Sequence, residues 1–175
     1  AERTFGGDLV QGDTTVDGEL NLPVTIYELT DDAGSIRIAG MVSQITVVED
    51  TLQVAQVVSF QNVSDRAYST NIAVDAERYG SVRLAVPPGA QVVSVAADDS
   101  RYALASDGLA VIDTAPVLPN SEHLVQVVYR LPYTGQAQIE QVVEYAVNGP
   151  MRLLVTPSSL QITSEQFEVL DLQTL

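Results

Sequence analysis

The sequence predicts an all-β protein, namely an antiparallel β-sandwich of the immunoglobulin-like or jelly-roll-like kind. Helical periodicity is nearly absent from the 175 residues, whereas short runs of alternating apolar and polar residues recur along the chain. Turn signals such as Asp17-Gly18, Pro87-Pro88-Gly89 and Asn148-Gly149 separate these runs at short intervals. Short strands between frequent turns are typical of a sandwich.

We expect two segments, an extended N-terminal arm or edge strand over residues 1–20 and one sandwich domain over residues 21–175. The length suits one domain with a small appendage. The first 20 residues are rich in Gly and Asp and weakly apolar, which disfavours a stable isolated hairpin there. The first strand of the domain is predicted over residues 23–30.

Three longer strands carry the clearest alternation. Residues 36–49 change phase near Gly40, which predicts a β-bulge, because a one-residue slip would otherwise turn every later side chain to the opposite face. The core faces of residues 52–60 and 124–131 are expected to carry Leu52, Val54, Val58 and Phe60, and Val125, Val127, Tyr129 and Leu131. Further strands are predicted at residues 82–86, 91–96, 138–145, 152–156, 160–163 and 167–172.

Composition excludes several classes of function. The chain has 23 acidic and eight basic residues, a net charge of −15 and a pI near 4.1, so its field repels nucleic acid and anionic membrane surfaces. It contains no Cys, which excludes disulfides and thiolate chemistry. All eight basic residues are Arg, and without Lys a P-loop or a Schiff base is excluded. No apolar run is long enough to predict a membrane span.

The one histidine of the chain, His123, follows Ser121 and Glu122, residue types that resemble a catalytic set. In an extended chain Ser121 and His123 lie about 6.5–7 Å apart, too far for the hydrogen bond that activates a serine. No GxSxG motif is present. We therefore expect a polar lead-in to the strand over residues 124–131, with His123 near the surface, and we assign no catalytic residue and no cofactor.

Acidic residues gather in several loops. Asp13, Asp17 and Glu19 are the weak candidates for Ca²⁺ ligands, because this ion binds several carboxylate oxygens. Neither this loop nor the pairs Asp31-Asp32 and Asp98-Asp99 matches an EF-hand pattern. The favoured interpretation is turn chemistry, in which Asp side chains bond nearby amides.

Two other patterns have both a structural and a functional interpretation. Asn62-Val63-Ser64 matches a glycosylation signal but is short, and Arg66 beside it is expected to pair with Asp65 or with a distant carboxylate. Tyr129, Tyr133 and Tyr145 lie in neighbouring β segments. They are either ordinary amphipathic strand residues or a binding face that offers apolar area with a hydroxyl group.

Four segments occur in an order that carries a resemblance: "LPVTIYELTDDAGSIRI" (22–38), "LQVAQVVSFQNVSDRAYS" (52–69), "VRLAVPPGAQ" (82–91) and "DTAPVLPNSEHLVQVVYRLPY" (113–133). The order resembles a family of exported bacterial β-sandwich proteins of uncharacterised function, some of which are membrane-anchored or lie beside c-type cytochrome domains. Asn120 stands where the family pattern has Gly. The resemblance implies export and a sandwich fold, and it implies no catalytic residue. Ala1 is also the kind of end that signal-peptide removal leaves, as other trimming does.

These observations predict a non-enzymatic, extracytoplasmic structural or interaction protein. We expect it to be a subunit of a surface filament or envelope assembly, which self-associates through residues 1–20 by β-strand addition. The alternatives are an accessory subunit of a membrane-associated, redox-linked complex, whose acidic surface docks a basic carrier, and a sandwich that binds Ca²⁺ or glycan. A hydrolase is a further alternative, because glycosidase carboxylates need no local motif.

Overall fold

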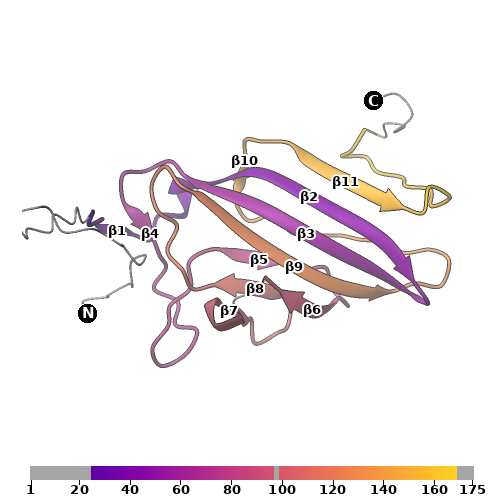
Figure 1. Cartoon of the computed structure of the whole chain (residues 1–175), viewed down its shortest axis with the longest axis horizontal. Coiled ribbons are helices and arrows are strands. Elements are labelled where there is room, and N and C mark those ends of the chain that lie inside the picture. The colour runs from indigo at the N-terminus through magenta and orange to yellow at the C-terminus, as the bar shows by residue number, and fades with distance from the viewer. Residues whose placement is uncertain (1–24, 97–98, 169–175) are drawn as a thin grey trace, which may run out of the picture.

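The computed structural model describes residues 25–96 and 99–168, and this part of the chain is mostly β structure arranged in several sheets (Figure 1). The predicted arm over residues 1–20 and the Ca²⁺ candidates Asp13, Asp17 and Glu19 lie outside the described residues. No helix among the described residues is long and apolar enough to cross a membrane. The elements are β1 (Leu29–Thr30), η1 (Ala33–Ser35), β2 (Ile36–Val48), β3 (Thr51–Asn62), β4 (Ala67–Tyr68), β5 (Arg83–Ala85), β6 (Gln91–Val95), η2 (Asp99–Arg101), β7 (Tyr102–Leu104), β8 (Ala110–Asp113), β9 (Glu122–Pro132), β10 (Ala146–Val147) and β11 (Met151–Thr156).

The main sheet has six strands in the order β10-β2-β3-β9-β6, with β11 also paired to β2. The long strands β2, β3 and β9 form its centre and run antiparallel, as the alternation predicts. The two C-terminal strands differ from the expectation of an antiparallel fold, because β10 and β11 both pair parallel to β2. A parallel neighbour needs a connection of a dozen or more residues, and the 13 residues between the end of β9 at Pro132 and the start of β10 at Ala146 supply it.

A smaller sheet of three strands, β5-β8-β7, lies beneath one part of the main sheet (Figure 1). Buried side chains of both sheets belong to one hydrophobic core, in which Val82, Leu84 and Val111 join Val58, Phe60 and other residues of the long strands. The two short strands β1 and β4 form a separate parallel pair. The core face of β3 and β9 is the predicted one, with Val54, Val58, Val127 and Tyr129 at most 1% exposed.

The predicted bulge in β2 is confirmed. Its register with β3 shifts between Ile38 and Gly40, so that Ile36 and Ile38 before the shift and Met41 and Ile45 after it are all buried. Gly149, which precedes β11, lies directly against the bulged residue. A Cβ atom on Gly149 would overlap the carbonyl group of Ala39. The bulge is therefore also the place where the C-terminal strands dock on β2.

Several predicted strands differ from those observed. Of residues 23–30, the described part is paired only at β1, and residues 138–145 and 160–163 form no strand. Residues 167 and 168 are not paired either, and the rest of that prediction lies outside the described residues. The short strands β4, β7, β8 and β10 were not predicted. They have at most four residues each, too few for an alternating pattern to stand out.

Candidate functional site

The structure places His123 away from Ser121 and buries it, which corrects the expectation of a surface histidine. His123 is 7% exposed, because it occupies the same face of β9 as Val125 and Val127. The hydroxyl of Ser121 donates to the carbonyl of Leu118 at 3.0 Å instead. The predicted strand began at residue 124, after His123. The observed strand β9 begins at Glu122, and its alternation of exposed and buried residues already includes His123.

His123 belongs to a buried polar cluster with Asp113 of β8 and Arg101 of η2. Arg101 donates Nε to Oδ1 of Asp113 at 2.7 Å and Nη2 to Oδ2 at 2.5 Å, while His123 Nε2 lies 2.8 Å from Oδ2. The backbone N–H of Ala115 donates to Oδ1 at 2.9 Å. The four bonds fill the acceptor capacity of the carboxylate.

The electrostatics of this cluster favour a charged Asp113. Burial by itself raises the pKa of this carboxyl, but the hydrogen bonds from His123 and Arg101 outweigh burial, and the pKa lies below its ordinary value. Among the described residues the partners of His123 Nε2 are Arg101 and Asp113, and no hydroxyl group hydrogen-bonds this side chain. The cluster connects β9 of the main sheet to β8 of the smaller sheet, which is a structural role.

The other polar candidates are engaged in turns or in the core. Oδ1 of Asp32 accepts from the N–H of Gly34 at 2.9 Å, which is the turn chemistry expected of that acidic pair. Asn62 is 1% exposed, and its Nδ2 donates to the carbonyls of Arg66 and Val117, so the amide of the glycosylation pattern is occupied. Arg66 pairs with Glu28 at 2.9 Å on the surface. No group of three His, Cys, Asp or Glu side chains within residues 25–96 and 99–168 is arranged to hold a metal ion.

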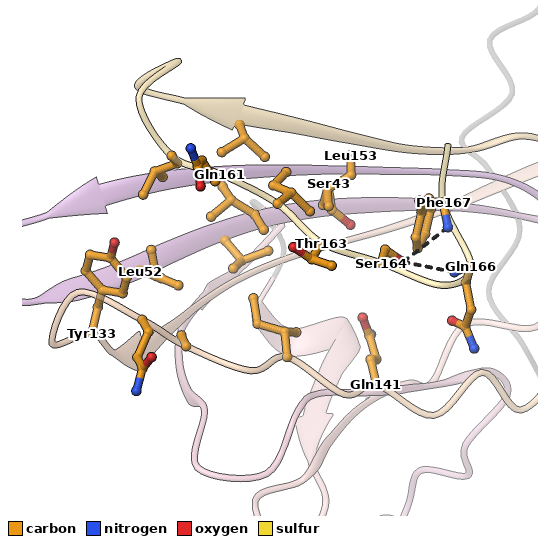
Figure 2. Close-up of a pocket in the computed structure, with 18 of the residues that line it drawn as sticks. Ser43, Leu52, Tyr133, Gln141, Leu153, Gln161, Thr163, Ser164, Gln166 and Phe167 are labelled. Atoms are coloured by element: carbon orange, nitrogen blue, oxygen red, sulfur yellow. Dashed lines mark hydrogen bonds between the residues drawn. The ribbon is translucent and has the colours of Figure 1, made fainter. Parts of the chain in front are cut away.

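A crevice of about 770 Å³ lies on the core side of the main sheet and is the candidate binding site. Its floor comes from the strands, and its walls come from two coil segments, residues 133–143 and 159–167 (Figure 2). Its lining includes no residue of β5, β7 or β8, so the crevice lies where coil rather than the smaller sheet covers the long strands. The apolar floor is formed by Met41, Ile45, Leu52, Val54, Met151, Leu153 and Val155.

Both coil segments line the crevice, the first with residues that include Ile139, Gln141 and Val143, and the second with every residue from 159 to 164. In the second segment burial alternates, because Leu160 and Ile162 are partly buried and their neighbours Gln161 and Thr163 are exposed. Near its end the second segment turns at Ser164, whose Oγ accepts from the N–H groups of Gln166 and Phe167, both at 3.1 Å (Figure 2). The alternation that predicted strands here therefore reflects burial of one side without pairing to another strand.

A pair of glutamine amides fixes the first segment to the sheet. Nε2 of Gln56 donates to Oε1 of Gln141 at 3.0 Å, and Nε2 of Gln141 donates back to Oε1 of Gln56 at 2.9 Å. Gln56 also donates to Oγ of Ser43 at 2.9 Å. Gln56 is 1% exposed at a core position of β3, and a polar residue in the apolar phase of a strand is the signal by which the sequence could have revealed this network.

Three tyrosines have two predicted interpretations, a binding face or ordinary strand positions. The structure places two of them in the crevice and the third outside it. Tyr129 and Tyr133 line the crevice. Tyr145 lies outside the lining, where its hydroxyl accepts from the N–H of Arg83 at 3.0 Å and its ring meets Phe60 edge to face. Tyr145 packs against the hydrophobic core, and burial raises the pKa of its hydroxyl.

No family model matches the chain, and no curated protein matches it. Among solved structures, the chain has 14% identity and a TM-score of 0.38 to an M1 zinc metallopeptidase from Deinococcus radiodurans, covering 56% of this chain and 21% of that one. For Legionella pneumophila aminopeptidase A in complex with aspartic acid the identity is 13%, the TM-score 0.36 and the coverage 54% and 10%. The chain thus spans about a fifth and a tenth of these enzymes, and a likeness at this level carries no information on activity.

Proposed function

We propose that this protein is a non-enzymatic β-sandwich that works outside the cytoplasm as a subunit of a larger assembly, which it joins by adding a strand at the free edge of β11. The observation that carries the proposal is the geometry of this edge. The extracytoplasmic location rests on the family resemblance of the four sequence segments.

The free edge of β11 offers backbone groups for pairing. β11 pairs with β2 on one side and with no strand on the other among the described residues. The carbonyl of Pro150 accepts from the N–H of Met41 at 3.0 Å and so faces β2. Because backbone direction alternates along a strand, the N–H and C=O groups of Met151, Leu153 and Val155 face away from the sheet.

The opposite edge of the sheet, at β6, is less suited to pairing. The register of β6 with β9 shifts between Val92 and Ser94, and an irregular, short edge strand resists addition of another chain. β11 has six residues in continuous register with β2, one charge at Arg152 and no proline within the strand. A regular, weakly charged edge is the kind that pairs with another chain.

The outward face of the main sheet beside this edge is also suited to protein contact. Val42, Val57, Leu124 and Leu154 are 36–46% exposed. Across the outward positions of β2, β3, β9 and β11 the charged residues are Arg37, Arg130, Arg152 and the single carboxylate Glu122, in a chain with 23 acidic residues. Protein interfaces are depleted of Asp and Glu and enriched in Arg, so this composition supports a protein partner on this face.

The strand that we expect to be added is residues 1–20 of a second copy. The test compares Leu153→Pro with Leu153→Ala, followed by light scattering during size-exclusion chromatography across protein concentration. Both variants remove the same side chain, but only proline removes the outward N–H. We expect the parent chain and Leu153→Ala to associate, and Leu153→Pro and a chain lacking residues 1–20 to remain monomeric with an unchanged circular dichroism spectrum.

Two results would contradict the proposal. One is a parent chain that stays monomeric up to high micromolar concentration and does not bind a synthetic peptide of residues 1–20. The other is association that survives Leu153→Pro in a protein that keeps its β spectrum, which would place the contact elsewhere on the surface.

A further inference from the structure

The crevice beneath the main sheet has the size and lining of a ligand site. Its volume of about 770 Å³ lies within the range of about 300–1,000 Å³ that is usual for small-molecule sites. Protein interiors normally leave few voids larger than a water molecule. Whatever fills this space must contact the apolar side chains of β2, β3 and β11 that form the floor.

The part of the lining that the structure describes is uncharged. None of these 24 residues is Asp, Glu, Arg or His, although Glu140 and Glu165 belong to the same coil segments. An ionised ligand group would therefore lose its hydration without gaining an ionic partner, which is costly. The lining selects for a neutral molecule.

Tyr129 supplies a hydrogen-bond donor that no described residue engages. The residue is 1% exposed, and its hydroxyl makes no hydrogen bond to any residue that the structure describes. Every fully buried side-chain polar atom in the described chain has a partner, so the hydroxyl borders open space, and the crevice is the space that Tyr129 lines. Burial alone raises the pKa of Tyr129 to about 12, so the hydroxyl keeps its proton and can donate.

The coil walls also bring polar side chains to the lining, namely Gln136, Ser159, Gln161, Thr163, Ser164 and Gln166. Other polar groups beside the floor have fewer bonds to offer. The amides of Gln56 and Gln141 bond each other, and the hydroxyl of Tyr133 donates to the carbonyl of Gly135 at 3.1 Å. Ser43 of β2 and Tyr129 of β9 both face the core, and β3 lies between their strands. Along the strand direction they are one core-facing position apart. Its oxygen accepts from Gln56, which leaves the hydroxyl proton of Ser43 as a second donor.

From the uncharged lining with its apolar floor and from the Tyr129 hydroxyl, which no described residue engages, we propose that the crevice binds a neutral amphiphile, an alkyl chain bearing an ester or ketone oxygen. The chain lies along the floor of β2, β3 and β11, and the oxygen accepts from Tyr129. This site is independent of strand addition at β11, because it uses side chains on the core face rather than the backbone groups of the edge.

The experiment measures displacement of the neutral dye Nile red from the full chain by methyl octanoate and by octanoate. The ester and the carboxylate share an alkyl chain, so their difference reports the charge of the headgroup. We expect the ester to bind at least tenfold more tightly. Equal binding, tighter binding of octanoate, or no binding of dye and ester would overturn the proposal.

Variants locate the site and its donor. Tyr129→Phe keeps the ring and is expected to weaken the ester about three- to tenfold, the range that one net hydrogen bond represents, without lowering thermal stability. Tyr133→Phe, whose hydroxyl is already engaged, is the matched control and should change affinity less than twofold. Ala137→Trp, at an exposed position of the wall, should block binding of both dye and ester.

Three outcomes contradict the assignment. Equal effects of Tyr129→Phe and Tyr133→Phe would remove the proposed donor, and binding unaffected by Ala137→Trp would place the ligand elsewhere. Binding that appears only after deletion of residues 169–175 would show that the chain itself occupies the crevice.

Discussion

Gln56 and Gln141, 85 residues apart, exchange two hydrogen bonds between their side-chain amides, one of 3.0 Å and one of 2.9 Å. The pair joins the centre of β3 to the coil that forms one wall of the crevice. Gln141 also donates to the carbonyl of Ala85 at 2.6 Å, which extends the connection to β5 of the smaller sheet. One amide thus fixes the coil between both sheets.

Loss of this connection should destabilise the fold. Gln141→Ala leaves the amide oxygen of Gln56 and the carbonyl of Ala85 without their partner, which should cost about 1–3 kcal/mol in urea denaturation. The double variant Gln56→Leu/Gln141→Leu should cost less than the sum of its single changes, with a coupling of about 0.5–3 kcal/mol. Gln136→Ala, an exposed residue of the same coil, should stay within about 0.5 kcal/mol of the parent. Additive single changes would show that the two amides do not act as a pair.

Asp113 should make stability depend on pH in the acid range. Its pKa in the folded protein is lowered from an unfolded value of about 3.9, so its contribution is complete above that value and is lost as pH falls through the folded pKa. Asp113→Asn should cost about 3 kcal/mol at pH 7, and the difference from the parent should shrink below about pH 4. Denaturation from pH 2 to 7 measures this. Asp65→Asn, an exposed control, should run parallel to the parent, and a difference for Asp113→Asn that does not vary with pH would contradict the assignment.

Replacing Asn62 by a side chain that can only accept hydrogen bonds should destabilise the fold. Its Nδ2 donates to two carbonyl oxygens, at 2.6 Å from Arg66 and 2.8 Å from Val117. A buried carboxylate would repel both oxygens, so Asn62→Asp should cost about 3 kcal/mol or more in thermal or chemical denaturation. Asn120→Asp is the control, because Asn120 is exposed and its φ of 56° suits both residue types. A similar small effect at both positions would mean that the Asn62 amide is not held as described.

The junction of the bulge with the C-terminal strands should depend on Gly149. Since a Cβ atom there would overlap the Ala39 carbonyl, Gly149→Ala must displace backbone and should cost about 3 kcal/mol. Gly40→Ala at the same junction meets its nearest atom, the Pro150 carbonyl oxygen, at 3.8 Å. That is an ordinary contact, and the change should have little effect. Melting temperatures of the two variants provide the comparison, and equal values would refute the steric reason.

The sequence allowed prediction of the long strands and the bulge, because their alternation records which side is buried. Residues 138–145 show why the same signal failed elsewhere. Gln141 and Val143 face the sheet as in a strand, but no neighbouring strand pairs with them. An alternation of apolar and polar residues indicates that one side of the segment is buried, but it does not indicate whether the backbone pairs with another strand.

The candidate site was predictable only in part. Strand phase places Tyr129 in the core, but the sequence leaves open whether it is an ordinary strand residue or part of a binding face. Its place in the crevice depends on coil segments whose course the sequence does not specify. Asp113 shares the phase of Val111, and a carboxylate in a core phase requires a cation. Nothing in the local sequence indicates that Arg101 of η2 and His123 of β9 supply the partners.

The parallel pairing of β11 with β2 has a consequence for biosynthesis. Met41 pairs with Met151, so the outer edge of β2 stays unpaired until the ribosome has synthesised a strand more than 100 residues later in the chain. At usual elongation rates the interval between the end of β3 and the end of β11 is roughly 5 to 20 s. During translation the nascent hairpin of β2 and β3 therefore displays an uncovered apolar edge, which makes this interval the period when a chaperone has most to protect.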